Sequence, residues 1–305
     1  MKSYVNDLSN NGVVVINLLD TIELQKYHDN FWDEIRQFPE YQNPTHDDNI
    51  YVMGAFGALG NAASFHNMTV RNLRKDAMNK LLPLFREFDK SNRYLQQLID
   101  RMSIRRQGTT PTKETWHRDQ SPIVEGDYIF GGWINLDLNN NQYFSCIPGT
   151  HFDPKEIIGF DKVDANTIKP YLKRKKLYTI PPGHCIIFYQ NILHEVLAKK
   201  TKTTSIRLYL GWRLTNSPQL LFNYDLQNQG ICQLPSGQLP PMYAKMHLCF
   251  NKEKVISWST DTFKPVCLTS VNLVDRFMKS LTHYNLPLYP AYDQEELNNL
   301  KGIQL

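Results

Sequence analysis

The pattern of hydrophobic and polar positions predicts helices in the first third of the chain and strands after it. A helix over residues 21–38 is predicted by apolar side chains near helical spacing, namely Ile22, Leu24, Tyr27, Phe31 and Ile35. Similar patterns predict helices over residues 67–88, where Pro83 could break the helix, and over residues 92–100. Residues 1–17 predict a short strand, and strand-like segments dominate from Met102 to Leu214.

This order of elements favours an α+β fold in which N-terminal helices buttress a double-stranded β-helix, a jelly-roll variant. A chain of 305 residues can bury a substantial core. We expect a domain over residues 1–215, with the β-helix at about 100–215. The sequence changes character after Asn216-Ser217-Pro218, so residues 216–305 are expected to form a C-terminal extension of unassigned role.

Composition indicates an intracellular protein, cytoplasmic or nuclear with the cytoplasm favoured, and narrows little else. The net charge of +4 is too small to indicate a polyanionic partner, and the basic runs at 173–176 and 199–202 are interpreted as solvated loops. The alternative is that these runs steer an anionic substrate toward the site. No segment approaches the roughly 18 apolar residues of a membrane span, and the polar start has no signal-peptide core. Five scattered cysteines are interpreted as reduced thiols.

The motif Trp116-His117-Arg118-Asp119 carries the main candidate chemistry. Because side chains alternate along a strand, His117 and Asp119 leave the same face about 7 Å apart, and Arg118 points away. A third imidazole from a distant strand would complete the two-His-one-carboxylate face that suits non-heme Fe(II). His194 is the candidate, since it follows an apolar strand that Pro182-Gly183 introduces.

A second candidate residue lies on the next strand. Arg207 and Tyr209 share one face of residues 205–212, while Ile206, Leu208, Leu210 and Trp212 share the other. We therefore expect Arg207 to point into a pocket. Its guanidinium could bind a carboxylate through two hydrogen bonds, which the distal carboxylate of a keto-diacid cosubstrate requires.

Taken together, these motifs resemble the phytanoyl-CoA dioxygenase family of Fe(II)/2-oxoglutarate-dependent oxygenases over about residues 10–215. The resemblance is carried by Gly12–Ile16 with the helix after it, Trp-His-x-Asp at 116–119, Trp133-Ile134-Asn135-Leu136-Asp137, Ile147–His151, Pro-Gly-x-x-x-x-Phe at 182–188, and the pair His194 and Arg207.

The resemblance implies a dioxygenase that uses Fe(II), 2-oxoglutarate and O2, with ascorbate as a supporting reductant, and that hydroxylates a small molecule with release of succinate and CO2. It implies that His117, Asp119 and His194 bind the metal. Arg207 would anchor 2-oxoglutarate, and Trp133 and Asn135 would line it. Related halogenases lack the carboxylate ligand, so the presence of Asp119 favours hydroxylation.

Two departures from the family pattern keep the substrate open. Arg118 stands where the family often has Gln, and Glu195-Val196 replaces a frequent Gly-Ser pair. Two other hypotheses remain: an AlkB-like nucleic-acid demethylase, suggested by Arg207-x5-Arg213, and a non-catalytic jelly-roll binding protein. Arg207 could instead form a structural salt bridge, with Arg213 as the anchor, and Trp133 and Asn135 could be core residues.

Overall fold

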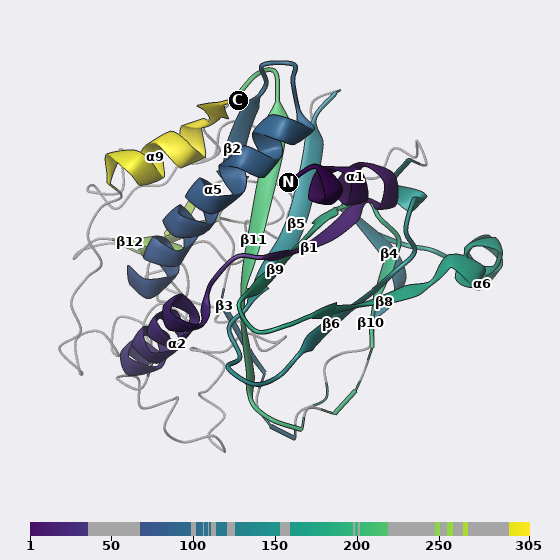
Figure 1. Cartoon of the computed structure of the whole chain (residues 1–305), viewed down its shortest axis with the longest axis horizontal. Helices are drawn as coiled ribbons and strands as arrows, with labels where there is room; N and C mark the ends of the chain where they lie inside the picture. The colour runs from purple at the N-terminus through teal and green to yellow at the C-terminus, as the bar shows by residue number, and fades with distance from the viewer. Residues whose placement is uncertain are drawn as a thin grey trace.

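The computed structural model describes residues 1–35, 68–98, 102–105, 107–108, 110, 114–120, 126–152, 159–197, 199–200, 202–218, 248–250, 255–258, 265–267 and 293–305. These residues form helices and antiparallel sheets, as the sequence predicts (Figure 1).

Two antiparallel sheets form the centre of the molecule. Sheet A has the order β1-β9-β5-β11-β2-β15, with β3 also paired to β11, and sheet B has the order β7-β4-β10-β6-β8. The strands of sheet A are β1 (Val13–Asn17), β2 (Tyr94–Leu98), β3 (Met102–Arg105), β5 (Tyr128–Asn135), β9 (His184–Tyr189), β11 (Ser205–Thr215) and β15 (Ile303–Gln304). Those of sheet B are β4 (Glu114–Gln120), β6 (Gln142–Cys146), β7 (Gly159–Lys162), β8 (Lys176–Ile180) and β10 (His194–Val196).

The inner face of sheet A packs against sheet B through aromatic side chains. Phe144 of β6 stacks on Phe188 of β9 with ring centroids 4.4 Å apart, and Trp133 of β5 lies 5.6 Å from Phe144. The chain crosses between the sheets repeatedly from β3 to β11, an order consistent with a double-stranded β-helix. A third sheet consists of β12 (Leu248–Phe250), β13 (Val255–Trp258) and β14 (Pro265–Cys267).

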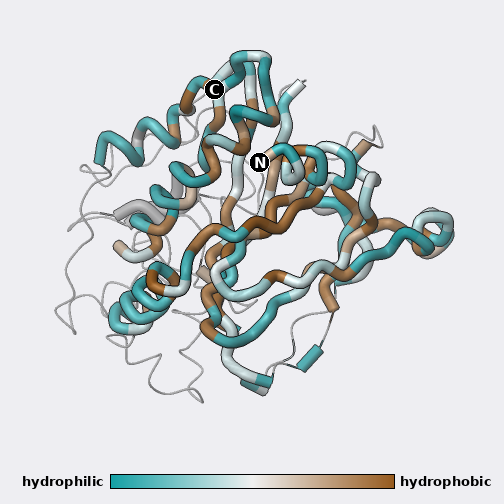
Figure 2. Tube along the Cα trace, in the orientation of Figure 1, coloured by the Kyte–Doolittle hydropathy of each residue, from teal (hydrophilic) through white to brown (hydrophobic). Residues whose placement is uncertain are grey.

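Helices cover the outer face of sheet A. They include α1 (Lys2–Asn11), α2 (Thr21–Ile35), α5 (Met68–Phe88) and α9 (Gln294–Lys301), and Figure 1 shows α2, α5 and α9 on one side of the sheet. Apolar residues recur along α5 (Figure 2). They pack against the strands, and the ring centroids of Phe85 and Trp212 of β11 lie 5.8 Å apart. Burying such a side chain stabilises the fold by about 1.5–3 kcal/mol. Shorter turns are η2 (Thr150–Phe152), α6 (Ala165–Ile168) and η3 (Lys169–Arg174).

Helix α5 runs through Pro83 without a break. The proline removes one backbone hydrogen bond, but apolar residues on both sides of it, such as Leu81 and Phe85, remain buried in the core. Helix α2 is confirmed to Ile35, and residues 36–38 lie outside the described residues. Ile22 is 81% exposed and does not belong to the buried stripe.

One predicted element is wrong, and another is confirmed only in part. Residues 94–98 form strand β2 rather than a helix, because pairing with β11 on one side and β15 on the other satisfies their backbone groups. Residues 2–11 form helix α1, and only Val13–Asn17 form the predicted strand. Gly12 ends α1 with φ of 75°, a left-handed conformation that glycine adopts without strain.

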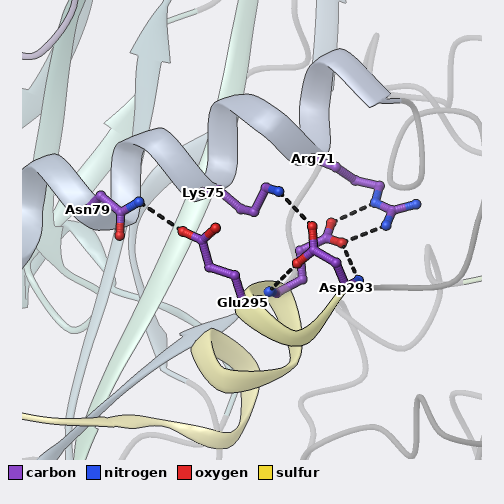
Figure 3. Close-up of polar contacts among 6 residues, drawn as sticks. Arg71, Lys75, Asn79, Asp293 and Glu295 are labelled. Carbon is purple, nitrogen blue, oxygen red and sulfur yellow. Dashed lines mark hydrogen bonds and ion pairs between the residues drawn. The ribbon is translucent and has the colours of Figure 1, made fainter.

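The C-terminal residues return to the main sheet. β15 pairs with β2, and α9 lies along α5 through polar contacts that Figure 3 shows. Cys146 and Cys185 are buried and unpaired, as expected of reduced thiols. None of the described helices is both long and apolar enough to cross a membrane.

Candidate metal centre

The three predicted metal ligands lie together on the inner face of sheet B. Strand β10 pairs antiparallel with β4 so that His194 lies opposite His117, and Asp119 follows two residues along the same face. One side-chain atom from each of the three residues lies within 4.8 Å of the other two. The predicted alternation of β4 is therefore found, and pairing with β10 supplies the distant imidazole.

Both imidazoles are oriented by the backbone. His117 Nδ1 lies 2.6 Å from the carbonyl oxygen of Thr115, and His194 Nδ1 lies 2.9 Å from that of Ile192. With the proton assigned to Nδ1, each ring donates to a carbonyl and presents the lone pair of Nε2 toward Asp119. The Oδ2 atom of Asp119 lies 3.3 Å from His194 Nε2 and 3.9 Å from His117 Nε2.

Burial and mutual charge set the protonation of this group. Burial, together with repulsion from His194, lowers the pKa of His117 to about 4. Burial also acts to lower the pKa of His194. In the protonated imidazolium, however, Nε2–H donates to Asp119, and this bond, the charge of Asp119 and the bond to the Ile192 carbonyl together raise that pKa above its ordinary value. Burial acts to raise the pKa of Asp119, and its contacts with His194 and His117 lower it overall. Asp119 is thus an anion and His117 a neutral imidazole at neutral pH.

Arg118 lies on the opposite face of β4, as predicted, and is buried. Its Nη1 donates to the carbonyl oxygen of Thr150 at 2.7 Å and to that of Asn191. The side chain that separates two of the predicted ligands therefore ties β4 to the turn that precedes His194, the third predicted ligand. Arg118 therefore helps to position the site from the opposite face of the sheet and does not line it.

Arg207 projects from β11 into the space between the sheets. Its guanidinium carbon lies 5.0 Å from the centre of the Trp133 ring and 6.0 Å from that of Tyr209. The neighbouring residues of β11, Ile206 and Leu208, belong to the core on the helix side of sheet A. The predicted alternation of this strand is therefore found, with Trp133 beside Arg207.

Arg213, the alternative anchor, is engaged elsewhere. Its Nε donates to Asp127 Oδ2 at 2.6 Å, and both side chains are buried. Asn135 is also occupied by the fold: its amide nitrogen donates to the carbonyls of Asn140 and Ile180 at 2.8 Å, and its Oδ1 accepts from the backbone N–H of Asp137. These contacts give Asn135 a structural role.

Two charged residues that sequence reasoning missed also lie at the site. The pairing of β4 with β10 is irregular between His194 and Val196, so that Glu114 lies opposite Val196 and its Oε2 lies 3.8 Å from His117 Nε2. No sequence signal marks such a bulge. Arg105 of β3 lies opposite Ser205, and the alternation of residues 102–105 could have placed it on the inner face.

Comparison with known proteins establishes the fold and no family. No protein-family model matches the sequence, and no curated protein matches it. Among solved structures, AviO1 from Streptomyces viridochromogenes Tue57 has a TM-score of 0.50 and 11% identity, over 71% of this chain and 95% of that one. At this identity the likeness concerns the fold alone.

Two further solved structures are complexes with 2-oxoglutarate (alpha ketoglutarate). EvdO2 from Micromonospora carbonacea var. aurantiaca, complexed with 2-oxoglutarate, has a TM-score of 0.48 and 12% identity, over 79% of this chain and 95% of that one. The epimerase SnoN, in complex with Fe3+, alpha ketoglutarate and nogalamycin RO, has a TM-score of 0.48 and 14% identity, over 69% of this chain and 82% of that one.

Proposed function

We propose that this protein is an Fe(II)- and 2-oxoglutarate-dependent dioxygenase of the phytanoyl-CoA dioxygenase type that hydroxylates a small molecule. The observation that carries this proposal is the convergence of His117, Asp119 and His194 on one point, with both Nδ1 atoms already bonded to carbonyls. Two imidazoles and one carboxylate fit Fe(II) and leave coordination positions for other ligands. The strand order supports our assignment of the two sheets to a double-stranded β-helix.

Bound Fe(II) would supply the redox chemistry in which one O2, one 2-oxoglutarate and one substrate C–H bond give an alcohol, succinate and CO2. The protein's side chains would bind the metal and the cosubstrate and exclude water. Asp119 offers the anionic ligand whose presence favours hydroxylation over halogenation, and Arg207 would bind the distal carboxylate of 2-oxoglutarate. The rings of Trp133, Phe144 and Phe188 form an apolar wall beside His194, which keeps water from this side of the site.

A small molecule is favoured over nucleic acid as the substrate. The demethylase hypothesis rests on the spacing of Arg207 and Arg213, yet Arg213 forms a buried ion pair with Asp127. Of the two arginines, therefore, only Arg207 faces the space between the sheets, where the candidate metal ligands lie. We also propose a cytoplasmic location and an extension over residues 216–305, both from the sequence.

The test is formation of succinate. Protein loaded anaerobically with Fe(II), then given O2, ascorbate and 2-oxoglutarate, is expected to form succinate slowly alone and faster with its true substrate among a panel of acyl thioesters, amino acids, nucleotides and peptides. Asp119→Ala is the control, because it removes the charged ligand. Succinate no higher than in this control, with full iron loading, would replace the enzyme hypothesis with that of a binding protein.

A further inference from the structure

Two arginines, Arg105 and Arg207, share the inner face of sheet A on neighbouring strands. In the antiparallel register of β3 and β11, Arg105 lies opposite Ser205 and Arg207 lies opposite Ser103. The two arginines are thus diagonal neighbours, and such residues lie roughly 7–8 Å apart in an antiparallel pair, within reach of long side chains. Ile104 and Ile206, opposite each other in the same register, point to the helix side.

Both guanidinium groups lack an oxygen partner within the part of the chain that the structure describes. Other arginines of the core have one: Arg71 binds Glu296, Arg213 binds Asp127, and Arg118 binds backbone carbonyls. Arg207 instead contacts aromatic rings, and Arg105 is partly buried beside it. Two partly buried cations without a bound anion are unfavourable, because each is desolvated and each repels the other.

The electrostatics of Arg105 point in the same direction. Burial has the largest effect and lowers the pKa of Arg105, and repulsion from Arg207 lowers it further. Tyr209 and Glu114 act to raise this pKa, but their effects are smaller. Glu114 therefore compensates the pair only in part, and its carboxylate lies beside His117. An anion placed between the two guanidinium groups would remove their repulsion and gain charge-assisted hydrogen bonds from both.

We propose that Arg105 and Arg207 together bind the distal carboxylate of 2-oxoglutarate, so that Arg105 is a second determinant of cosubstrate specificity. This inference rests on the proposed function. The cosubstrate is favoured over an anionic group of the substrate because Arg207, the proposed anchor, is the diagonal neighbour of Arg105 on this face, and one carboxylate with two oxygens can accept from both.

The experiment measures binding rather than turnover. Anaerobic Fe(II)-loaded protein is titrated calorimetrically with 2-oxoglutarate and with 2-oxopentanoate, which has a methyl group in place of the distal carboxylate. Arg105→Gln and Arg207→Gln are each expected to weaken 2-oxoglutarate binding by about tenfold to a hundredfold, since each removes charge-assisted contacts. Binding of 2-oxopentanoate should change less than about twofold, because it offers these groups no carboxylate.

The controls separate this role from a general loss of charge or fold. Arg174→Gln removes an exposed arginine of η3 and should bind both ligands as the wild type does. Arg105→Lys keeps the charge and should recover part of the affinity for 2-oxoglutarate, even if Arg105→Gln folds poorly.

Each other outcome overturns a defined claim. Wild-type affinity for 2-oxoglutarate in Arg105→Gln, with loss only in Arg207→Gln, would refute the paired site and leave the proposed function intact. Equal weakening of both ligands in Arg105→Gln would refute the carboxylate role. Absence of 2-oxoglutarate binding by the iron-loaded wild type would overturn the proposed function itself.

Discussion

At the scale of residues, the candidate site is organised before any metal binds. Each histidine donates Nδ1–H to a carbonyl two residues earlier, and these short-range contacts orient Nε2 of His117 and His194 toward the carboxylate of Asp119. Loss of contacts that merely orient ligands typically lowers metal affinity about 10–100-fold. Loss of a ligand itself should cost more.

We therefore predict that His117→Ala, Asp119→Asn and His194→Ala each lower bound iron from about one ion per chain to less than about a tenth of that. Elemental analysis after anaerobic loading and desalting measures this ratio. Glu114→Gln is the matched control for Asp119→Asn, because the Glu114 carboxylate also lies near His117 but outside the converging group. Unchanged iron in all three ligand variants, or loss only in Glu114→Gln, would contradict the triad.

The sequence alone predicts these residues to different degrees. His117 and Asp119 follow from the two-residue period of one strand. His194 is marked by the apolar run of β9 that precedes it, but the pairing of the short strand β10 with β4, which places His194 opposite His117, has no such signal. Glu114 cannot be predicted in this way, since a bulge in β4 shifts the alternation. The prediction for Asn135 is limited for a different reason. The pattern places it near the site, but its amide donates to the carbonyl of Ile180, a residue distant in sequence, and this contact cannot be predicted from the pattern.

At the scale of elements, long-range strand pairing can determine the secondary structure of a segment against its local preference. The pattern of residues 92–100 favoured a helix, yet β2 forms there because it lies between β11 and β15. The side chain of Asp89 stabilises the short connection between helix α5 and strand β2. Its carboxylate accepts from the backbone N–H and Oγ of Ser91 and from Nε of Arg93, and the side chain is buried.

Asp89→Asn is expected to lower the free energy of unfolding at pH 7 by about 1–3 kcal/mol, because a buried charged hydrogen-bond network is disrupted. Burial acts to raise the pKa of Asp89, but the bonds from Arg93 and Ser91 outweigh it, so the pKa is lowered in the folded protein. A lowered pKa stabilises the fold above the unfolded value and loses this effect as pH falls through the folded value. The difference between variant and wild type should thus be full at pH 7 and shrink below about pH 4.

Urea unfolding at several pH values checks this prediction. Glu87→Gln is the control, because Glu87 lies in the last turn of α5, is partly exposed and forms a surface ion pair with Lys90. It should leave the midpoint unchanged at every pH. A destabilisation of Asp89→Asn that is as large at pH 3 as at pH 7 would show that shape, not charge, is what Asp89 contributes.

At the scale of the whole molecule, both ends of the chain complete the same sheet. Strand β1 lies at one end of the strand order of sheet A and β15 at the other, so residues 293–305, here the C-terminal clamp, cover the edge of β2. A strand of two residues has no periodicity, which is why the sequence could not predict this closure. The capping box of α9, Asp293 with Glu296, is the one part of the clamp with a readable signature.

The clamp is held to α5 by contacts of unequal strength (Figure 3). Arg71 and Glu296 form two hydrogen bonds of 2.6 and 2.5 Å, and their side chains are only 2% and 6% exposed. Lys75 and Asp293 also pair, but the Asp293 side chain is 51% exposed, so water and salt screen this interaction. The buried pair should therefore dominate.

Glu296→Gln is expected to destabilise the protein by about 3 kcal/mol or more, because it leaves the Arg71 charge buried with a neutral partner. The exposed neighbour Glu295→Gln, which changes a surface contact with Asn79 and a screened attraction to Lys75, should cost less than about 0.5 kcal/mol. Hydrogen exchange localises the effect: amides of β2 should exchange faster in Glu296→Gln than in Glu295→Gln. The double variant Arg71→Met with Glu296→Leu should recover much of the stability, since an apolar pair of similar volume carries no desolvation cost. If Glu296→Gln exchanges at β2 like the wild type, the strand pairing of β15, rather than the ion pair, holds the clamp in place.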